Sequence, residues 1–271
     1  MGKESPVGWS TVKLQQGVMV LSPLGNPVAG IGHNFFRPWL YPLYSPSGRQ
    51  VLQEYPFDHP FHNGLFIGWN PIKHKGRDHN FWATPPQRSE PDPMMANLGQ
   101  VKTLDCCVIQ SSEESLQLTQ GLEWVDSDGN KLFRETRTFT FWQPSILSHA
   151  VRMESILNCL TTYPIIFEPT KFAGVGVRLD PALTPALGGR FENSSGEIGN
   201  AKCFHGNCFE SLTVRSSNGC LELKIHPEGF LGPWFVRDYG LVLLNPSSPS
   251  SQTIGLGQSI SHSIELTASD I

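Results

Sequence analysis

The chain has 271 residues, of which 39% are hydrophobic and 16% charged, and its formal net charge is −4 at pH 7. This length allows one large β domain or two small ones, with a core that needs no disulfide or metal support. No cluster of lysine and arginine occurs, which excludes the basic surface that nucleic acids require and argues against an anionic membrane surface as a partner.

Runs that alternate polar and apolar residues, as half-buried strands do, dominate the sequence. The clearest run, 115–125, precedes the turn-like DSDGN (126–130) and the Thr- and Phe-rich run 132–142, which predicts a hairpin. Further strands are predicted at residues 18–21, 101–109, 147–157, 175–179, 209–215, 221–226, 239–244 and 259–266. Strands without interleaved helices predict an all-β fold with few short helices, an antiparallel β-sandwich. We expect one domain over residues 1–271, ordered from about residue 10 to 267.

The N-terminal sequence lacks the apolar segment of a secretion signal, and no run of 18 apolar residues occurs. The six cysteines form no CxxC pair. We therefore expect a cytoplasmic protein with reduced thiols. The Pro-rich, polar segment 87–95 is expected to form a loop that covers a pocket.

The densest cluster of reactive side chains lies between residues 58 and 82 and contains four of the nine histidines. Pro60 and Gly64 disfavour a regular helix or strand over its first part. A bent segment there can aim Asp58, His59 and His62 at one point.

Three interpretations of this cluster remain open. In the first, His59 and His62 act as acid and base, because imidazole titrates near neutral pH. In the second, Asp58, both of these histidines and His79 bind a metal, although an HxxH pair outside a regular element is a weak metal signal. In the third, the histidines are buried and bind backbone carbonyls at a turn. We favour the first interpretation and expect no metal.

Charged groups elsewhere are candidates for the same pocket. Lys171, between a predicted strand and a glycine-containing turn, could polarise a carbonyl group, and Glu168 lies near it in the sequence. Arg237 could hold an oxygen-rich group through paired hydrogen bonds. For both cations the alternative is a structural or solvent-exposed role. Arg37 and Trp39 could supply another cation and an aromatic wall.

We expect His59, His62, Lys171 and Arg237 to be catalytic and to meet around one void between two sheets. The residues expected to bind the substrate are Arg37, Trp39, Asp58, Asn63, Phe66, Trp69, Asn80, Trp82, Glu168, Phe172, Trp234 and Tyr239.

The sequence contains no GxGxxG, Walker, GxSxG or HExxH motif, which disfavours a nucleotide cofactor and a serine-hydrolase mechanism. We therefore expect no cofactor. The expected partner is a small-molecule substrate, and exposed strand edges would allow a homodimer.

Several blocks of the sequence, taken in order, resemble a known family. They are RPWLYPLYSPSG (37–48), DHPFHNGLFIGW (58–69), HNFW (79–82), LFRETRTF (132–139), EPTKFAG (168–174), FENSSGEIGN (191–200) and PWFVRDYGLVLLNP (233–246). Over roughly residues 20–265 they are similar to the PmoA-like family of β proteins, often labelled methane oxygenase PmoA. The resemblance implies a galactose mutarotase-like supersandwich with a pocket for a cyclic, oxygen-bearing molecule.

Three positions depart from the pattern of that family and make the implied pocket less polar. Asn63, Asn80 and Phe172 stand where the family usually has more polar or charged residues. We therefore predict a cofactor-independent isomerase, cyclase or lyase, in one variant a pericyclase such as a Diels–Alderase, that acts on a largely apolar natural-product intermediate. One alternative is a carbohydrate-active epimerase, lyase or hydrolase, with Asp58 and Glu168 as its carboxylate pair. The other is a non-catalytic module that binds a small molecule.

Overall fold

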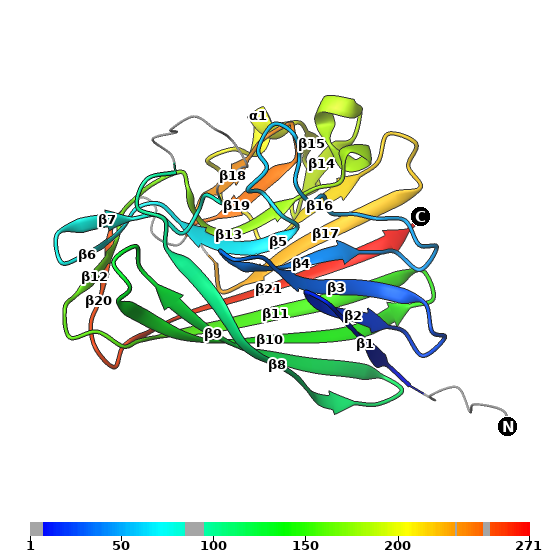
Figure 1. Ribbon diagram of the computed structural model, residues 1–271. Helices are drawn as coiled ribbons and strands as arrows, with labels where there is room; N and C mark the ends of the chain where they lie inside the picture. The colour runs from blue at the N-terminus through cyan, green and yellow to red at the C-terminus, as the bar shows by residue number, and fades with distance from the viewer. Residues whose placement is uncertain (1–7, 85–94, 231, 246–249) are drawn as a thin grey trace, which may run out of the picture.

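The computed structural model describes residues 8–84, 95–230, 232–245 and 250–271. Two large antiparallel sheets lie one above the other, with a smaller sheet at one end (Figure 1). The predicted all-β, antiparallel sandwich is confirmed. The helices of the described residues are short: α1 (Ala201–Phe204) and the 3₁₀ turns Pro181–Leu183 and Pro185–Leu187. The predicted pocket-covering loop lies outside the described residues except at Met95.

The first large sheet has eight strands in the order β1-β2-β3-β4-β5-β13-β19-β18. Their bounds are β1 (Ser10–Leu14), β2 (Gly17–Leu21), β3 (Pro27–His33), β4 (Pro38–Leu43), β5 (Leu65–Trp69), β13 (Ala173–Arg178), β18 (Trp234–Val236) and β19 (Leu241–Leu244).

The second large sheet has nine strands in the order β15-β14-β16-β17-β21-β11-β10-β9-β8. Their bounds are β8 (Gln100–Ser111), β9 (Ser115–Val125), β10 (Lys131–Ser145), β11 (Ser148–Cys159), β14 (Arg190–Asn193), β15 (Ile198–Gly199), β16 (Leu212–Arg215), β17 (Leu221–Glu228) and β21 (Ser259–Asp270). The expected hairpin is present, since Lys131 of β10 pairs with Val125 of β9 across the turn that starts at Asp126.

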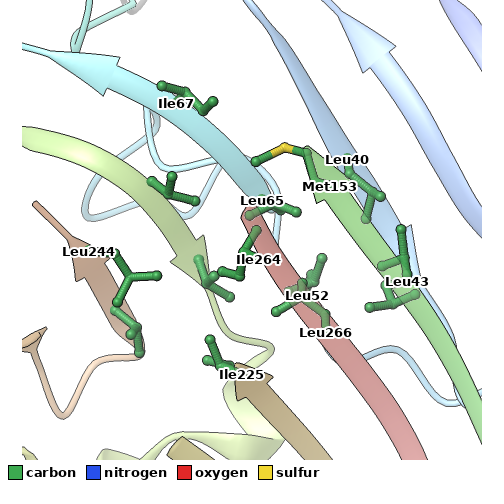
Figure 2. Packing of buried hydrophobic residues seen from close by; sticks show 14 of the residues in the cluster. Leu40, Leu43, Leu52, Leu65, Ile67, Met153, Ile225, Leu244, Ile264 and Leu266 are labelled. Carbon is green, nitrogen blue, oxygen red and sulfur yellow. The ribbon is translucent and has the colours of Figure 1, made fainter. Parts of the chain in front are cut away.

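The main core lies between these two sheets. Leu40 and Leu65 extend from the eight-stranded sheet, and Met153 and Leu266 from the nine-stranded sheet, all with no exposed surface (Figure 2). Each such buried side chain stabilises the fold by about 1.5–3 kcal/mol relative to an exposed one. The space between the sheets is therefore occupied mainly by apolar packing, with Glu135 and Arg137 buried as an ion pair within it.

A third, small sheet has four strands in the order β20-β12-β6-β7. Its strands are β6 (Ile72–His74), β7 (Arg77–His79), β12 (Ile165–Phe167) and β20 (Gln252–Ile254). Strands β6 and β7 form a hairpin whose two turn residues, Lys75 and Gly76, have φ angles of 52° and 76°. This left-handed pair is typical of the tight turns that match the twist of a hairpin.

No helix in the part of the chain that the structure describes is long and apolar enough to cross a membrane. The single domain, the cytoplasmic location and the homodimer stay predictions.

Candidate functional site

The candidate site lies on the outer face of the eight-stranded sheet, away from the main core. Phe66 of β5, Gly176 of β13, Leu243 of β19 and Phe235 of β18 pair in register across four strands, so they share one face. Phe66 and Leu243 belong to a small apolar cluster distinct from the main core. A Cβ atom at Gly176 would lie 2.4 Å from the ring of Phe66, which explains the glycine at this position.

The most reactive arrangement on this face is a dyad of Asp58 and His59. The Nδ1 atom of His59 lies 2.9 Å from Oδ2 of Asp58. Arg178, at the end of β13, donates from Nη2 to both carboxylate oxygens, at 2.9 and 3.2 Å. Burial raises the pKa of Asp58, but the bonds from His59 and Arg178 outweigh it and the net pKa lies below the usual value. The carboxylate therefore stays ionised and directs Nε2 of His59 away from the dyad.

Four rings are stacked in parallel beside this dyad. Tyr239 and His59 are 5.0 Å apart with an interplanar angle of 10°, and His59 and His62 are 4.9 Å apart at 9°. His62 in turn lies 6.0 Å from Phe66. The stack runs from the partly exposed Tyr239 down to the buried sheet, so it fixes the orientation of His59.

His62 is buried in this stack and stays neutral in the folded protein. Only 2% of the residue is exposed, and its Nδ1 atom has no hydrogen-bond partner. Burial, with smaller contributions from His59 and Arg37, lowers its pKa from 6.5 to about 2. A neutral imidazole without access to solvent cannot act as a general acid, so we assign His62 to the wall of the site.

The burial of His62 predicts a specific acid sensitivity. The unfolded chain binds a proton at this residue below pH 6.5 and the folded chain does so only near pH 2, so the free energy of unfolding falls as the pH decreases between these values. The contribution of one such group is about 1.4 kcal/mol per pH unit. Urea denaturation between pH 7 and 4.5 is expected to show a shallower decline for His62→Phe and His62→Leu than for the wild type. An unchanged slope in both variants would contradict the assignment.

Arg37 supports the wall from behind. Its Nη1 atom donates to the carbonyl of Trp82 at 2.7 Å, Nη2 donates to the carbonyl of Phe61, and the guanidinium lies 4.3 Å from the ring centroid of Phe66. Only 1% of Arg37 is exposed, and burial lowers its pKa to about 9. We therefore place Arg37 behind the apolar wall as a positioning residue.

A cavity of about 430 Å³ opens on the same face. Lys171, His205, Phe235 and Leu243 are among its lining residues. The guanidinium of Arg237 lies 4.0 Å from the ring centroid of Phe235, at the edge of this cavity. Because Phe235 and Leu243 continue the row that begins at Phe66, the cavity and the ring stack share one surface.

The prediction that the functional groups meet between two sheets is wrong, because the main core fills that space. His59, Lys171 and Arg237 lie on the outer face instead, together with Phe172, whose ring is 6.0 Å from that of Trp82.

Other predicted residues have structural contacts. Trp69 belongs to the main core and packs against Phe167, so we remove it from the candidate site. Asn63 and Asn80 accept hydrogen bonds from backbone amides of their own loops. Glu168 is paired with Lys73 at 2.8 Å.

Trp234 and Trp39 retain contact with the outer face. Trp234 lines the cavity with part of its surface, but its Nε1 atom donates to the carbonyl of Phe209. Trp39 lies in the small apolar cluster and donates to Oε1 of Glu54 at 2.6 Å.

Arg178 and His205 were missed by the sequence analysis. The alternation in β13, where Val175 and Val177 enter the core, could have placed Arg178 on the opposite face. His205 follows the short helix α1 and carries no local signal in the sequence.

Residues 32–269 match the model of a protein family described as Family of unknown function (DUF6807). The chain belongs to this family. The predicted membership of the PmoA-like family is therefore wrong, because the DUF6807 model is the one that matches. The departures from the PmoA-like pattern lose their meaning, and with them the argument against a sugar substrate. No curated protein matches this DUF6807 chain.

Solved structures similar to this DUF6807 protein include one animal and one bacterial protein of the epimerase type. A GalM/aldose epimerase homologue from C. elegans is 11% identical, covers 97% of this chain and 99% of its own, and has a TM-score of 0.41. Galactose 1-epimerase from Lactobacillus acidophilus is 8% identical, with coverages of 97% and 98% and a TM-score of 0.45. At these values neither structure bears on the chemistry of this chain, which depends on its own residues.

Proposed function

We propose that this protein is a cofactor-independent isomerase of the epimerase type, which acts on a small cyclic, hydroxylated molecule such as a sugar. The observation that carries the proposal is the Asp58–His59 pair, held by Arg178 and stacked on Tyr239. A fixed imidazole with one free nitrogen is the arrangement that general acid–base catalysis needs.

The chemistry follows from the orientation of the dyad. With Nδ1 bonded to Asp58, the Nε2 atom of His59 can accept the proton of the anomeric hydroxyl group while the bond between the anomeric carbon and the ring oxygen breaks and the ring oxygen takes up a proton from Tyr239 or water. Ring closure on the other face of the new carbonyl group reverses both proton transfers. Burial raises the pKa of Tyr239, so its hydroxyl stays protonated and can donate a hydrogen bond to a substrate oxygen. Both groups face the same side of the sheet, so they can act on one ring.

The surroundings of the dyad support a substrate with one apolar face and several hydroxyl groups. Flat aromatic surfaces pack well against the C–H face of a ring. Trp39 and Tyr55 contact each other edge to face, with centroids 5.8 Å apart. Burial raises the pKa of Glu54, an effect that its bond from Trp39 partly offsets. Glu54 and Asp58 would accept hydrogen bonds from hydroxyl groups at the edge of such a ring.

A second candidate is the cyclase or lyase acting on a largely apolar natural-product intermediate. The observation that favours it is the cavity beside Phe235 and Leu243, into which Lys171 brings a cation able to polarise a carbonyl group. A pericyclic step there would need only the shape of the cavity and one hydrogen bond.

Polarimetry separates the two candidates. Freshly dissolved α-anomers of common hexoses and pentoses are mixed with the wild type, with His59→Asn and with His226→Asn, whose partly buried histidine lies in β17 of the other large sheet. We expect the wild type and His226→Asn to accelerate the approach to anomeric equilibrium for at least one sugar, and His59→Asn to show no acceleration. Absence of acceleration across the panel would reject the epimerase proposal in favour of the apolar substrate.

A further inference from the structure

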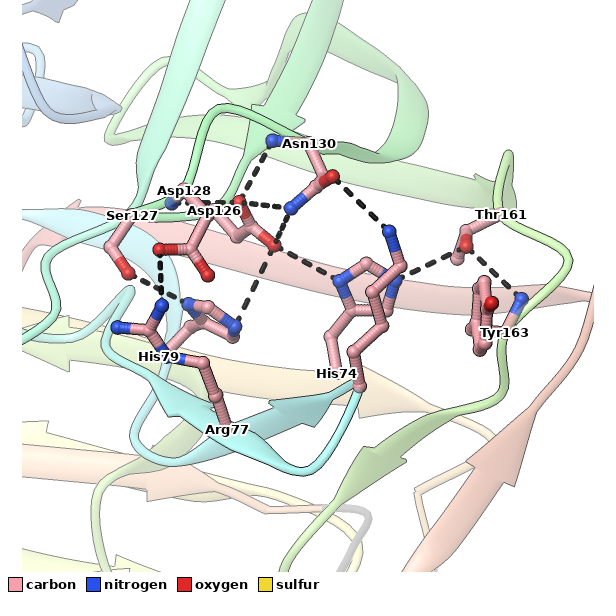
Figure 3. Close-up of polar contacts among 10 residues, drawn as sticks. His74, Arg77, His79, Asp126, Ser127, Asp128, Asn130, Thr161 and Tyr163 are labelled. Atoms are coloured by element: carbon pink, nitrogen blue, oxygen red, sulfur yellow. Dashed lines mark hydrogen bonds and ion pairs between the residues drawn. The ribbon is translucent and has the colours of Figure 1, made fainter.

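A compact group of two histidines and one aspartate lies outside the candidate site. His74 ends β6, His79 ends β7, and Asp126 opens the turn between β9 and β10 (Figure 3). One ligand atom from each residue lies within 4.8 Å of the others, and the three residues are at most 4% exposed. None of these elements contributes to the Asp58–His59 dyad.

The hairpin geometry explains why the two histidines share a face. His79 pairs with Ile72, and Ile72 is two residues from His74 on the same strand. Directly paired residues lie on one side of a sheet, as do residues two apart in a strand. Both imidazoles therefore point toward the β9–β10 turn, where Asp126 is located (Figure 3).

The outward nitrogen of each imidazole is already bonded to a hydroxyl group. Nε2 of His74 lies 3.2 Å from Oγ1 of Thr161, which also accepts a bond from the amide of Tyr163. Nδ1 of His79 lies 2.9 Å from Oγ of Ser127. In the tautomers that donate outward to these oxygens, each imidazole presents a lone pair toward Asp126, and a metal ion would then take the place of the proton between Nδ1 of His74 and Oδ2 of Asp126. Such outer hydrogen bonds are the usual support of metal-ligating histidines.

The distances from the aspartate to the two histidines are close to those between metal ligands. Oδ2 of Asp126 is 3.0 Å from Nδ1 of His74 and 3.6 Å from Nε2 of His79. Ligands of a tetrahedral zinc ion with bonds of about 2.0–2.1 Å lie about 3.4 Å apart. Nε2 of His79 is buried and has no hydrogen-bond partner. This nitrogen is therefore available as a metal ligand at the centre of the group.

Hydrogen bonds also fix the orientation of the Asp126 carboxylate. Its Oδ1 atom accepts bonds from the amides of Asp128 and Asn130, at 2.9 and 2.8 Å. These bonds orient Oδ2 toward the histidines. The carboxylate of Asp126 supplies one negative charge, which would offset part of the charge of a divalent cation.

We propose that His74, His79 and Asp126 bind a divalent transition-metal ion of the zinc type. The ion would join the β6–β7 hairpin of the small sheet to the β9–β10 turn of the nine-stranded sheet. Two nitrogens and one carboxylate oxygen favour zinc over magnesium or calcium, which prefer oxygen ligands. The burial of the group fits a structural role. The proposal does not depend on the proposed isomerase activity.

The test measures zinc binding and thermal stability in the full chain. Protein stripped with a chelator is titrated with ZnCl₂, and the bound metal and Tm are measured for the wild type, His79→Asn and His226→Asn. Asparagine can keep the bond to Ser127 but lacks an atom in the place of Nε2. We expect one tightly bound zinc ion and a rise in Tm of at least about 3 °C for the wild type and His226→Asn, and neither effect for His79→Asn. MgCl₂ at the same concentration is expected to leave Tm unchanged.

Several outcomes would overturn the proposal. If the wild type binds no stoichiometric zinc and its Tm does not change, the group is a buried His74–Asp126 hydrogen bond and not a metal site. Equal zinc binding by His79→Asn would place the ion elsewhere, for example on the exposed thiols of Cys107, Cys203 and Cys208, which this variant keeps. If His79→Asn does not fold, Co²⁺ replaces zinc in the wild type. Visible absorption bands of a tetrahedral complex with nitrogen and oxygen ligands support the site, and their absence rejects it.

Discussion

Replacement of Glu135 by alanine is expected to lower the free energy of unfolding by about 3–5 kcal/mol, because it leaves a buried cation without its partner. Glu135 lies inside the sandwich with no exposed surface, and Arg137 is 1% exposed. The carboxylate accepts bonds of 2.7 Å from Arg137 Nε, Ser155 Oγ and Trp124 Nε1. All three donors would lose their acceptor in the variant. Denaturation by urea or guanidinium measures the effect.

A double variant provides the control for this prediction. Glu135→Leu combined with Arg137→Met removes both charges, so no unpaired ion remains, and buried ion pairs replaced by apolar residues of similar volume are often neutral in stability. We expect the double variant to be more stable than Glu135→Ala. A single variant within 1 kcal/mol of the wild type would show that the carboxylate does not compensate the charge of Arg137.

Replacement of His59 by alanine is expected to reduce kcat/KM by about 10²–10⁴-fold on any sugar that the wild type turns over, the usual contribution of a positioned acid or base. Asp58→Asn is expected to fall in the same range. An asparagine amide can donate to Nδ1 of His59, which favours the tautomer with the proton on Nε2. Nε2 then has no lone pair to accept a proton from the substrate. Steady-state polarimetry with both variants measures the two effects.

His226→Ala serves as the matched control, because it removes an imidazole from a strand of the other sheet. Turnover of Asp58→Asn at the wild-type rate would show that the carboxylate has no part in orienting His59. Full activity of His59→Ala would remove proton transfer by this residue from the mechanism.

The long hairpins and the site strands β13 and β19 could be predicted from sequence, whereas β4 and β5 of the same sheet could not. Strands β9 and β10 alternate over most of their length and are separated by a five-residue turn. Strand β5 is buried on both faces, so it has no alternation to recognise. Strand β4 contains two prolines, which count against a strand in any local pattern.

The residues of the site could be predicted only in part for a related reason. His59 and Asp58 stand out in the sequence because they are adjacent and polar. The burial that keeps His62 neutral depends on the ring stack with Phe66 and with Tyr239, which is far away in the sequence. Trp69 looks like a wall residue in sequence, yet it is three residues from Phe66 in the same strand and therefore faces the other side of the sheet. Register across strands, which decides such questions, is set by tertiary packing.

The location of the dyad on the outside of the eight-stranded sheet separates two selective pressures. Substitutions among the apolar residues between the sheets would alter folding stability while the dyad keeps its surroundings. Changes in the loops that carry Asp58 and Tyr239 would alter the surroundings of the dyad while the core packing stays intact. A lineage of such proteins could therefore diversify in chemistry on a constant scaffold, and an engineer could stabilise the interior first and redesign the exterior afterwards.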